Sequence, residues 1–432
     1  MTTVFSLLYL FPQNPPIMKK IVLLIFAIDL SLELLLQYFD FVGDSDKQHL
    51  QKVLQYFTNQ DILNGKEYSQ AGFGISIVSL LLTNFLGIYL VLGKLSFAIE
   101  DFANRIARSN KLVRNFLYFF FYVVITTLLQ LPFSFYFGYT LEHQFGFSNL
   151  TVGLWFWKKA KQFLVTIVLG GISVLFTLWV IEKIKVWWVF VVPIAGLVFG
   201  LFMTIVYPYT ILPIFYESAP IENGSLKTKI LALAEHSQIP VSDIYVIQES
   251  QYSNHTNAFF IGFGKYKRIY LYDTLIKTNT EGEILSVLAH EIGHWVHNDM
   301  IWGILFSFLT SLFTFICLYL ILVQFQKGKL IRELHSPSSI PAFLFVFGIL
   351  GTFLGPLDNW VGRDQESLAD YTALVLTDDS KSFISSEVKL AKQNKSRLDE
   401  HPFVIALRHS HPPTMQRIQM AEEYEKFLQG KR

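Results

Sequence analysis

The sequence predicts a mostly helical, polytopic membrane protein with about seven transmembrane helices and a small water-facing α+β segment. Of its 432 residues, 52% are hydrophobic and 16% are charged, a balance that is not typical of soluble domains. The 41 Phe, 20 Tyr and 8 Trp suit both the hydrocarbon core and the headgroup belts of a bilayer. We therefore expect the lipid bilayer to surround much of the chain.

Seven windows of mostly apolar residues are each long enough to cross a bilayer, which takes roughly 20 residues at about 1.5 Å per residue. They are residues 21–39, 73–92, 117–137, 163–181, 186–211, 301–325 and 340–357. The first window contains Asp29 and Glu33. Carboxylates inside a span are costly and usually face protein or water, so we expect this helix to line an interior space.

The windows divide the chain into four parts: a five-span membrane region, a water-facing segment, the sixth and seventh spans, and a charged helical part. These parts are residues 1–215, 216–300, 301–360 and 361–432. In the water-facing segment, residues 226–236 have a helical repeat, and residues 244–247 and 268–272 have the pattern of strands. This segment is therefore expected to be α+β.

Charge and cysteine content exclude several functions. Lysine plus arginine number 35 and aspartate plus glutamate 34, a net charge of +1 that gives no general attraction to nucleic acid. The single cysteine, Cys317, excludes an intramolecular disulfide and a thiolate zinc cluster. Any metal ion must then be bound by histidines and carboxylates.

The distribution of basic residues predicts an orientation. If all seven windows span the membrane, the basic clusters before the first window, after the second and after the sixth lie on one face. The water-facing segment lies on the other face. The positive-inside rule then places residues 216–300 outside the cytoplasm.

Residues His290 to His294 form an HExxH motif in a run with helical periodicity. His290 and His294 lie one above the other on the same helical face, so both imidazoles can bind one Zn²⁺. Glu291 is rotated around the helix, which suits it to accept a proton from water rather than to bind the metal. The motif therefore supplies two zinc ligands and a candidate general base.

Three classes of zinc protease differ in the third ligand. A histidine six residues after His294 would indicate a metzincin, but Met300 occupies that position. An aspartate in a later span would indicate an intramembrane site-2-type protease, and Asp358 is the candidate. The third alternative is an ExxxD motif, in which Glu366 and Asp370 lie one turn apart. One of these carboxylates can bind zinc while the other accepts the outer N–H of a ligand histidine.

Several further segments accompany these two motifs: residues 244–246, 253–262, 268–275 and 410–413, and Arg417. The combination is far more specific than HExxH alone and extends over nearly the whole chain. It resembles the type I CAAX prenyl proteases, seven-span zinc metalloproteases of membranes. The resemblance implies about seven membrane helices around a chamber, closed on one side by a small α+β zinc metallopeptidase domain.

The resemblance also implies the roles of individual residues. His290, His294 and Glu366 would bind one zinc ion per chain, and Glu291 would be the general base. Asp370 would lie behind the zinc ligands as a supporting carboxylate.

Three more positions follow from the resemblance. Asn257 and Ala258 would belong to an edge strand that binds the substrate backbone, because such a strand offers unpaired N–H and C=O groups. His411 would stabilise the oxyanion of the reaction. Arg417 would orient the site by pairing with a carboxylate.

We therefore expect an integral-membrane zinc metalloendopeptidase, in a membrane of the endoplasmic reticulum type in a eukaryote or the cytoplasmic membrane in a bacterium. Its substrate would be a prenylated CAAX C-terminus or a membrane protein in quality control, and the chain is expected to be a monomer. The resemblance implies a zinc domain that faces the cytosol, contrary to the basic-residue distribution, and we follow the resemblance because its motifs are the stronger signal. A channel or transporter with a degenerate zinc motif is the alternative; it would explain Asp29 and Glu33 but not the intact ligand set.

Overall fold

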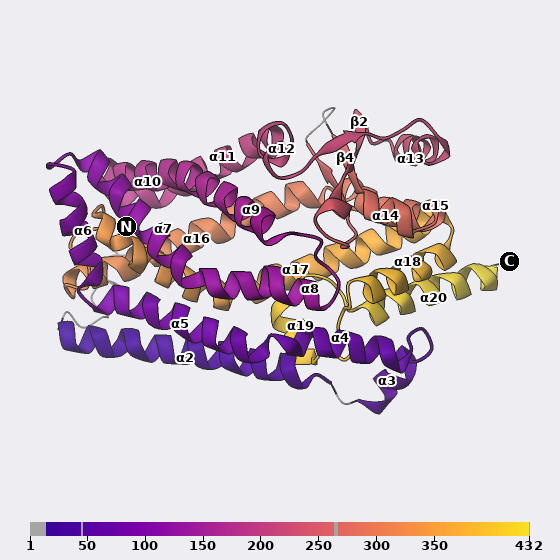
Figure 1. The fold of residues 1–432 in the computed structure, drawn as a ribbon, viewed down its shortest axis with the longest axis horizontal. Coiled ribbons are helices and arrows are strands. Elements are labelled where there is room, and N and C mark those ends of the chain that lie inside the picture. The colour runs from indigo at the N-terminus through magenta and orange to yellow at the C-terminus, as the bar shows by residue number, and fades with distance from the viewer. Residues whose placement is uncertain (1–13, 45, 263–266, 432) are drawn as a thin grey trace.

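The computed structural model describes residues 14–44, 46–262 and 267–431 and is mostly helical (Figure 1). Within these residues, six helical runs are long and apolar enough to cross a membrane. The seven predicted windows coincide with these runs, because the run Val152–Thr210 contains two of them. The break between these two windows lies at Lys185, whose φ of 51° ends one helix before the next begins.

The long helices extend along the long axis of the molecule (Figure 1). They are α2 (Pro15–Val42), α5 (Phe73–Leu92), α7 (Lys111–Phe135), α9 (Val152–Val165), α10 (Gly171–Ile184), α11 (Trp188–Thr210), α16 (Asp299–Lys327) and α17 (Ile340–Thr377). A π-helical turn, Tyr136–Leu141, follows α7, and another, Thr166–Gly170, joins α9 to α10. Many of their Leu, Ile, Phe and Trp side chains are exposed, as expected where lipid takes the place of water.

A four-stranded sheet lies at one end of these helices (Figure 1). Its strands are β1 (Ser218–Pro220), β2 (Asp243–Ile247), β3 (Ala258–Ile261) and β4 (Arg268–Tyr272). Their order is β1-β2-β4-β3, with β2 and β4 parallel and the outer pairs antiparallel. The predicted strands at 244–247 and 268–272 are β2 and β4, and the predicted helix is α13 (Ser225–His236). Ile230, Ile269 and Leu288 are fully buried where α13 and α15 (Glu281–Val296) pack on this sheet.

Helix α17 joins the membrane part to the ExxxD motif without interruption. The apolar window ends at residue 357, but the helix continues to Thr377, so the boundary expected at residue 360 falls inside it. The boundary expected at residue 300 likewise falls at the start of α16. The seventh span therefore carries Glu366 and Asp370 directly into the water-facing part.

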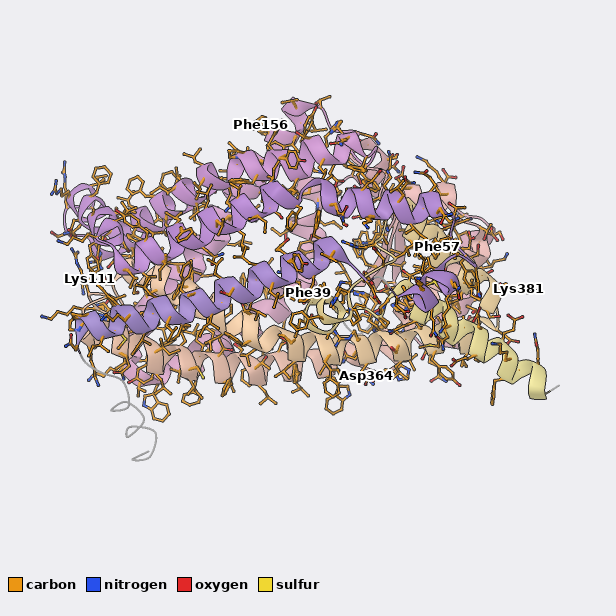
Figure 2. The ribbon with its side chains drawn as sticks, turned by 90° about the horizontal axis from the view of Figure 1, so that it is seen from below. Phe39, Phe57, Lys111, Phe156, Asp364 and Lys381 are labelled. Atoms are coloured by element: carbon orange, nitrogen blue, oxygen red, sulfur yellow. The ribbon has the colours of Figure 1, made fainter. Side chains whose placement is uncertain are left out.

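Two short helices of the N-terminal region also belong to the water-facing end, although the sequence analysis assigned residues 1–215 to the membrane region. They are α3 (Lys47–Val53) and α4 (Asn59–Ala71). Val53 and Phe57 pack against Ala391, Leu398 and Ile418 in a buried cluster. Figure 2 shows Phe57 at the same end of the molecule as Lys381, opposite Lys111.

The remaining helices connect these parts. They are α6 (Leu95–Ile106), α8 (Glu142–Gln144), α12 (Leu212–Phe215), α14 (Asp273–Thr278), α18 (Ser380–Gln393), α19 (Pro402–Arg408) and α20 (Thr414–Lys431).

Glu100 of α6 holds the loop between α16 and α17 at the opposite end of the molecule. It is only 4% exposed and accepts hydrogen bonds from the hydroxyls of Ser336 (2.7 Å) and Ser338 (2.5 Å). Arg332 lies 3.3 Å from the same carboxylate and 2.7 Å from Asp101. The side chain of Asp101 is 52% exposed. Two adjacent acids, one buried and one exposed, therefore pair with the same arginine.

We expect Glu100→Ala to destabilise the protein by on the order of 3 kcal/mol, because it leaves an arginine and two hydroxyls without their buried partner. Asp101→Ala is the matched control and should cost less than about 1 kcal/mol, since it removes only an exposed ion pair. The thermal midpoints of the two purified variants test this. Equal shifts would contradict the role assigned to Glu100.

Candidate metal centre

The HExxH motif lies in α15, whose start is fixed by its own sequence. Thr280 and Glu283 form a capping box: the Thr280 N–H donates to Glu283 Oε2 (2.7 Å), and the Glu283 N–H donates to Thr280 Oγ1 (3.4 Å). Glu283 also pairs with Lys389 of α18 at 2.7 Å. These contacts fix the helix, and its periodicity puts His290 and His294 on one face.

The close crossing of α15 and α17 depends on Gly293, which lies between the two histidines. A Cβ at this position would lie 2.8 Å from Ala369 Cα and 3.0 Å from the Ala369 carbonyl oxygen. Ala289 of α15 and Ala373 of α17 are also completely buried. Small side chains on both helices therefore let the backbones approach, and this brings Glu366 to the histidines.

His290, His294 and Glu366 meet at one point. The two histidine Nε2 atoms are 3.2 Å apart. Glu366 Oε2 lies 3.2 Å from His290 Nε2, and Glu366 Oε1 lies 3.4 Å from His294 Nε2. Ligands of a tetrahedral zinc ion with bonds of about 2.1 Å lie about 3.4 Å apart. The dimensions of this triangle therefore fit a zinc ion.

Each histidine directs its outer nitrogen to a carboxylate. His290 Nδ1 lies 2.7 Å from Asp370 Oδ1, and His294 Nδ1 lies 2.8 Å from Asp299 Oδ2. Because a carboxylate accepts, Nδ1 carries the proton and the Nε2 lone pair faces the cluster. Asp299 was not predicted from the sequence, because it follows a left-handed Asn298 (φ 58°) between two helices and so has no helical spacing to indicate its role.

The electrostatics of the cluster favour a cation. Two imidazole lone pairs and a carboxylate repel one another unless positive charge lies between them. Glu366 Oε2 is buried and has no hydrogen-bond partner in the part of the chain that the structure describes. Burial lowers the pKa of His290, but Asp370 and Glu366 outweigh burial and raise this pKa to about 10. The cluster therefore attracts positive charge, and its donor atoms are those that Zn²⁺ prefers.

Glu291 lines a cavity of about 450 Å³ beside the cluster. Burial raises the pKa of Glu291 above the usual range of a glutamate, although the neighbouring histidines lower it. A carboxylate with a raised pKa is a stronger base. The same cavity brings together the other candidate residues of the site: Asn257, Ala258, His290, His411 and Arg417.

His411 lies on the open side of the cluster. Its Nε2 is 3.2 Å from Glu366 Oε1, and 63% of its side chain is exposed. The hydroxyl of Ser410 lies 2.9 Å from His411 Nδ1. The ring is therefore within reach of both the cluster and anything that enters the cavity.

Arg417 of α20 lies behind the ligands. Its Nε donates to Asp370 Oδ2 at 2.7 Å, and its Nη1 lies 2.8 Å from Glu387 Oε2 of α18. Glu387 is 5% exposed and was not found by the sequence analysis, because no spacing connects it to either motif. Arg417 thus links the Asp370–His290 pair to a second buried carboxylate.

Ala258 begins β3, on the edge of the sheet, and Asn257 directly precedes it. The Tyr272 N–H donates to the Asn257 carbonyl at 3.0 Å, and Ala258 pairs with Leu271. Residues of an antiparallel ladder point their backbone groups alternately toward and away from the partner strand. The N–H and C=O of Ala258 therefore face the free edge of the sheet.

Asp358, the ligand expected for an intramembrane site-2-type protease, lies elsewhere. It is exposed and precedes Glu366 by about two turns of α17. Within the described residues, the one histidine and carboxylate group that could hold a metal ion is His290, His294 and Glu366.

Comparison with known proteins identifies the family. Residues 220–425 match the model of peptidase family M48, and residues 45–217 match that of the CAAX prenyl protease N-terminal region with five membrane helices. The uncharacterized metalloprotease YhfN of Bacillus subtilis is 31% identical over 307 residues, which cover 70% of this chain and 72% of the relative. The chain belongs to peptidase family M48, among the CAAX prenyl proteases.

Two further relatives support this assignment. CAAX prenyl protease 1 of Saccharomyces cerevisiae is 30% identical over 68% of this chain and 69% of its own. The crystal structure of Ste24p from S. mikatae matches with a TM-score of 0.80 at 24% identity, over 93% of this chain and 98% of that one. The expected fold class, a mostly α-helical polytopic membrane protein with a small α+β metallopeptidase domain, is confirmed.

Membership of this family fixes the broad activity. The chain is an integral-membrane zinc metalloendopeptidase that acts on peptides or proteins. Peptidases of family M48 depend on zinc, and the histidine and glutamate cluster fits this metal. The channel or transporter alternative therefore has no support.

We expect Glu366→Ala to lose most of its bound zinc, because only two imidazoles would be left to hold the ion. Asp370→Asn should weaken zinc binding less, by about 10- to 100-fold. Asp358→Ala, the control, should bind zinc as the parent does. Metal analysis of the three purified variants ranks them by zinc content. Zinc that is kept in Glu366→Ala but lost in Asp358→Ala would contradict the assignment of Glu366 as a ligand.

Gly293→Ala should separate α15 from α17 and reduce both stability and zinc content, because overpacking at a closed contact costs about 1–3 kcal/mol. Gly303→Ala in α16 is the matched control, since a Cβ there meets no atom within 4 Å. Thermal midpoints and zinc content of both variants check this. A Gly293→Ala protein that behaves like the control would show that the helices do not need this glycine.

Proposed function

We propose that His290, His294 and Glu366 bind one zinc ion and that Glu291 is the general base of peptide hydrolysis. The observation that carries this proposal is the triangle of ligand atoms, 3.2–3.4 Å on a side, with the outer nitrogens of both histidines on carboxylates. This arrangement directs two imidazole Nε2 atoms and a carboxylate toward one point, where a cation would be held.

A zinc ion in this position would polarise the scissile carbonyl and make water more acidic. Glu291 accepts the proton of the attacking water and later donates it to the leaving amine. Its raised pKa suits both steps, because the group must hold the proton between them. His411 donates an N–H to the oxygen of the attacked carbonyl as negative charge develops there.

Asp370, Asp299 and Arg417 position the metal ligands. Asp370 and Asp299 hold the two imidazoles in the tautomer that leaves Nε2 free. Arg417 neutralises Asp370 and keeps it from taking up the histidine proton. These three residues act through the ligands rather than on the substrate.

The free edge of β3 aligns the substrate. An extended peptide pairs with the backbone of Ala258 and contacts the side chain of Asn257, which directs its scissile bond toward Glu291. Main-chain pairing tolerates many side chains, so sequence preference has to arise elsewhere. All of these site residues come from one chain, which supports a monomer as the active unit.

We propose a prenylated CAAX C-terminus as the substrate, because relatives with about 30% identity are named CAAX prenyl proteases. Residues 216–300 and 361–432 together would form the peptidase domain, with the spans of residues 1–215 and 301–360 delivering the lipidated end. Hydrolysis of unlipidated membrane proteins in quality control is the competing substrate class.

The test is cleavage of a farnesylated CAAX peptide and of its unlipidated form by the purified full-length protein. A kcat/KM at least about tenfold higher for the farnesylated peptide would support the proposed substrate. Equal cleavage of both peptides, or cleavage of an unlipidated membrane protein alone, would overturn it while leaving the peptidase activity established.

Glu291→Gln should bind zinc as the parent does but lose nearly all hydrolysis, because an amide cannot accept the proton while the ligands are untouched. Zinc content and turnover are measured on the same preparation. Normal turnover by the zinc-loaded variant would exclude Glu291 from the mechanism.

A further inference from the structure

Asp29 is a buried carboxylate in the middle of α2 with an unused oxygen. It is 7% exposed and lies within a membrane-spanning helix, where an ionisable side chain is costly and usually marks a functional site. Asp29 Oδ1 has no hydrogen-bond partner among the described residues.

The other acid of this helix differs. Glu33 follows Asp29 by about one turn, and its Oε2 lies 2.5 Å from Nη2 of Arg408. No lysine, arginine or histidine in the described part of the chain lies within ion-pair distance of Asp29. One acid of α2 therefore has a counter-charge within the protein, whereas Asp29 has none among the described residues.

Asp29 lines a cavity of about 230 Å³ between α2, α5, α7 and α17. Cβ atoms at Gly87 and Gly348 would meet no atom within 4 Å, so these glycines leave the space open. None of the described residues that line the cavity is basic, and its polar lining consists of Asp29, Thr83, Asn84, Tyr122, Thr126 and Gln130.

The hydrogen bonds around the cavity leave acceptor oxygens available to a ligand. Asn84 Nδ2 donates to the Leu80 carbonyl at 3.0 Å, which leaves the Asn84 amide oxygen as an acceptor. Gln130 Nε2 donates to Thr83 Oγ1. With the unpartnered oxygen of Asp29, the cavity therefore presents one negative charge and further neutral oxygens.

We propose that this cavity binds a monovalent cationic group, with Asp29 as its counter-charge. A single carboxylate balances one positive charge, whereas protein sites for divalent ions usually supply more anionic oxygens. The volume holds an alkali ion with several waters, each of about 30 Å³, or the ammonium or guanidinium end of a side chain. The group is thus either a free alkali ion or a basic residue of the peptide substrate.

The possibility that the cationic group is a basic residue of the peptide substrate rests on the proposed function. It requires that the bound peptide reach from the metal cluster to Asp29. Gly348 and Glu366 lie on the same helix, five turns or about 27 Å apart. An extended peptide covers this distance in about eight residues. A basic residue about eight positions from the scissile bond would therefore reach Asp29 while the scissile bond lies beside Glu291.

The first experiment measures the thermal midpoint of the full-length protein in NaCl, in KCl and in N-methyl-D-glucamine chloride, all at equal ionic strength. The N-methyl-D-glucamine cation is bulky and serves as the control. A bound alkali ion should raise the midpoint by about 2 °C or more. Asp29→Asn and Gly348→Leu should lose this rise, because one removes the charge and the other fills the cavity. Asp358→Asn, which removes an exposed acid from α17, should keep it.

The second experiment compares cleavage of peptides that carry Lys, Ala or Glu at each of positions six to ten from the scissile bond. A substrate site predicts kcat/KM about fivefold or more higher for Lys than for Ala near position eight, and a ratio near one in Asp29→Asn. If no peptide is cleaved, the proposed function fails, and the thermal experiment still tests the site.

Either response, if it depends on Asp29, supports the cation site and identifies its source. The same response of the parent and Asp29→Asn to all three salts, together with equal lysine preferences, would overturn it. That result would mean that Asp29 is a neutral, protonated group in the wall of the cavity.

Discussion

The contact between α15 and α17 is the constraint on which the rest of the site depends. Gly293 and Ala369 let the two helices approach so closely that a Cβ on Gly293 would lie 2.8 Å from Ala369 Cα. At that separation, Glu366 reaches the histidines of α15 and Asp370 reaches the back of His290. Because α17 is also the last membrane-spanning helix, the metal cluster is held at a fixed height relative to the bilayer.

Buried charge then connects the cluster to the C-terminal helices. Asp370 binds His290 on one side and Arg417 on the other, and Arg417 continues to Glu387. Each member has a partner of opposite charge, which offsets the desolvation that burial imposes. Removing one member would leave another charge uncompensated, so α18 and α20 are part of the metal centre although they supply no ligand. The hydrophobic cluster of Val53 and Phe57 ties the same helices to the N-terminal region.

The membrane helices contain a second polar feature, the acids Asp29 and Glu33 of α2, away from the metal cluster. Glu33 is neutralised by Arg408 of α19, so the first helix is connected electrostatically to the segment that leads to His411. Asp29, about one turn away, faces a cavity that contains no basic side chain among its described residues. The metal cluster can thus supply the chemistry while the membrane helices contribute to recognition.

The sequence by itself determined the elements whose signals are local. Apolar windows of about 20 residues predicted each of the membrane-spanning runs found among the described residues, and the spacings of HExxH and ExxxD predicted which side chains share a helical face. Tertiary structure alone decided which faces meet. The Asp299–His294 and Arg417–Glu387 pairs, the continuity of α17 beyond residue 360, and the packing of α3 and α4 on α18 and α20 depend on contacts between segments without a common period. No spacing in a single sequence encodes such contacts, because they are fixed only when the helices pack.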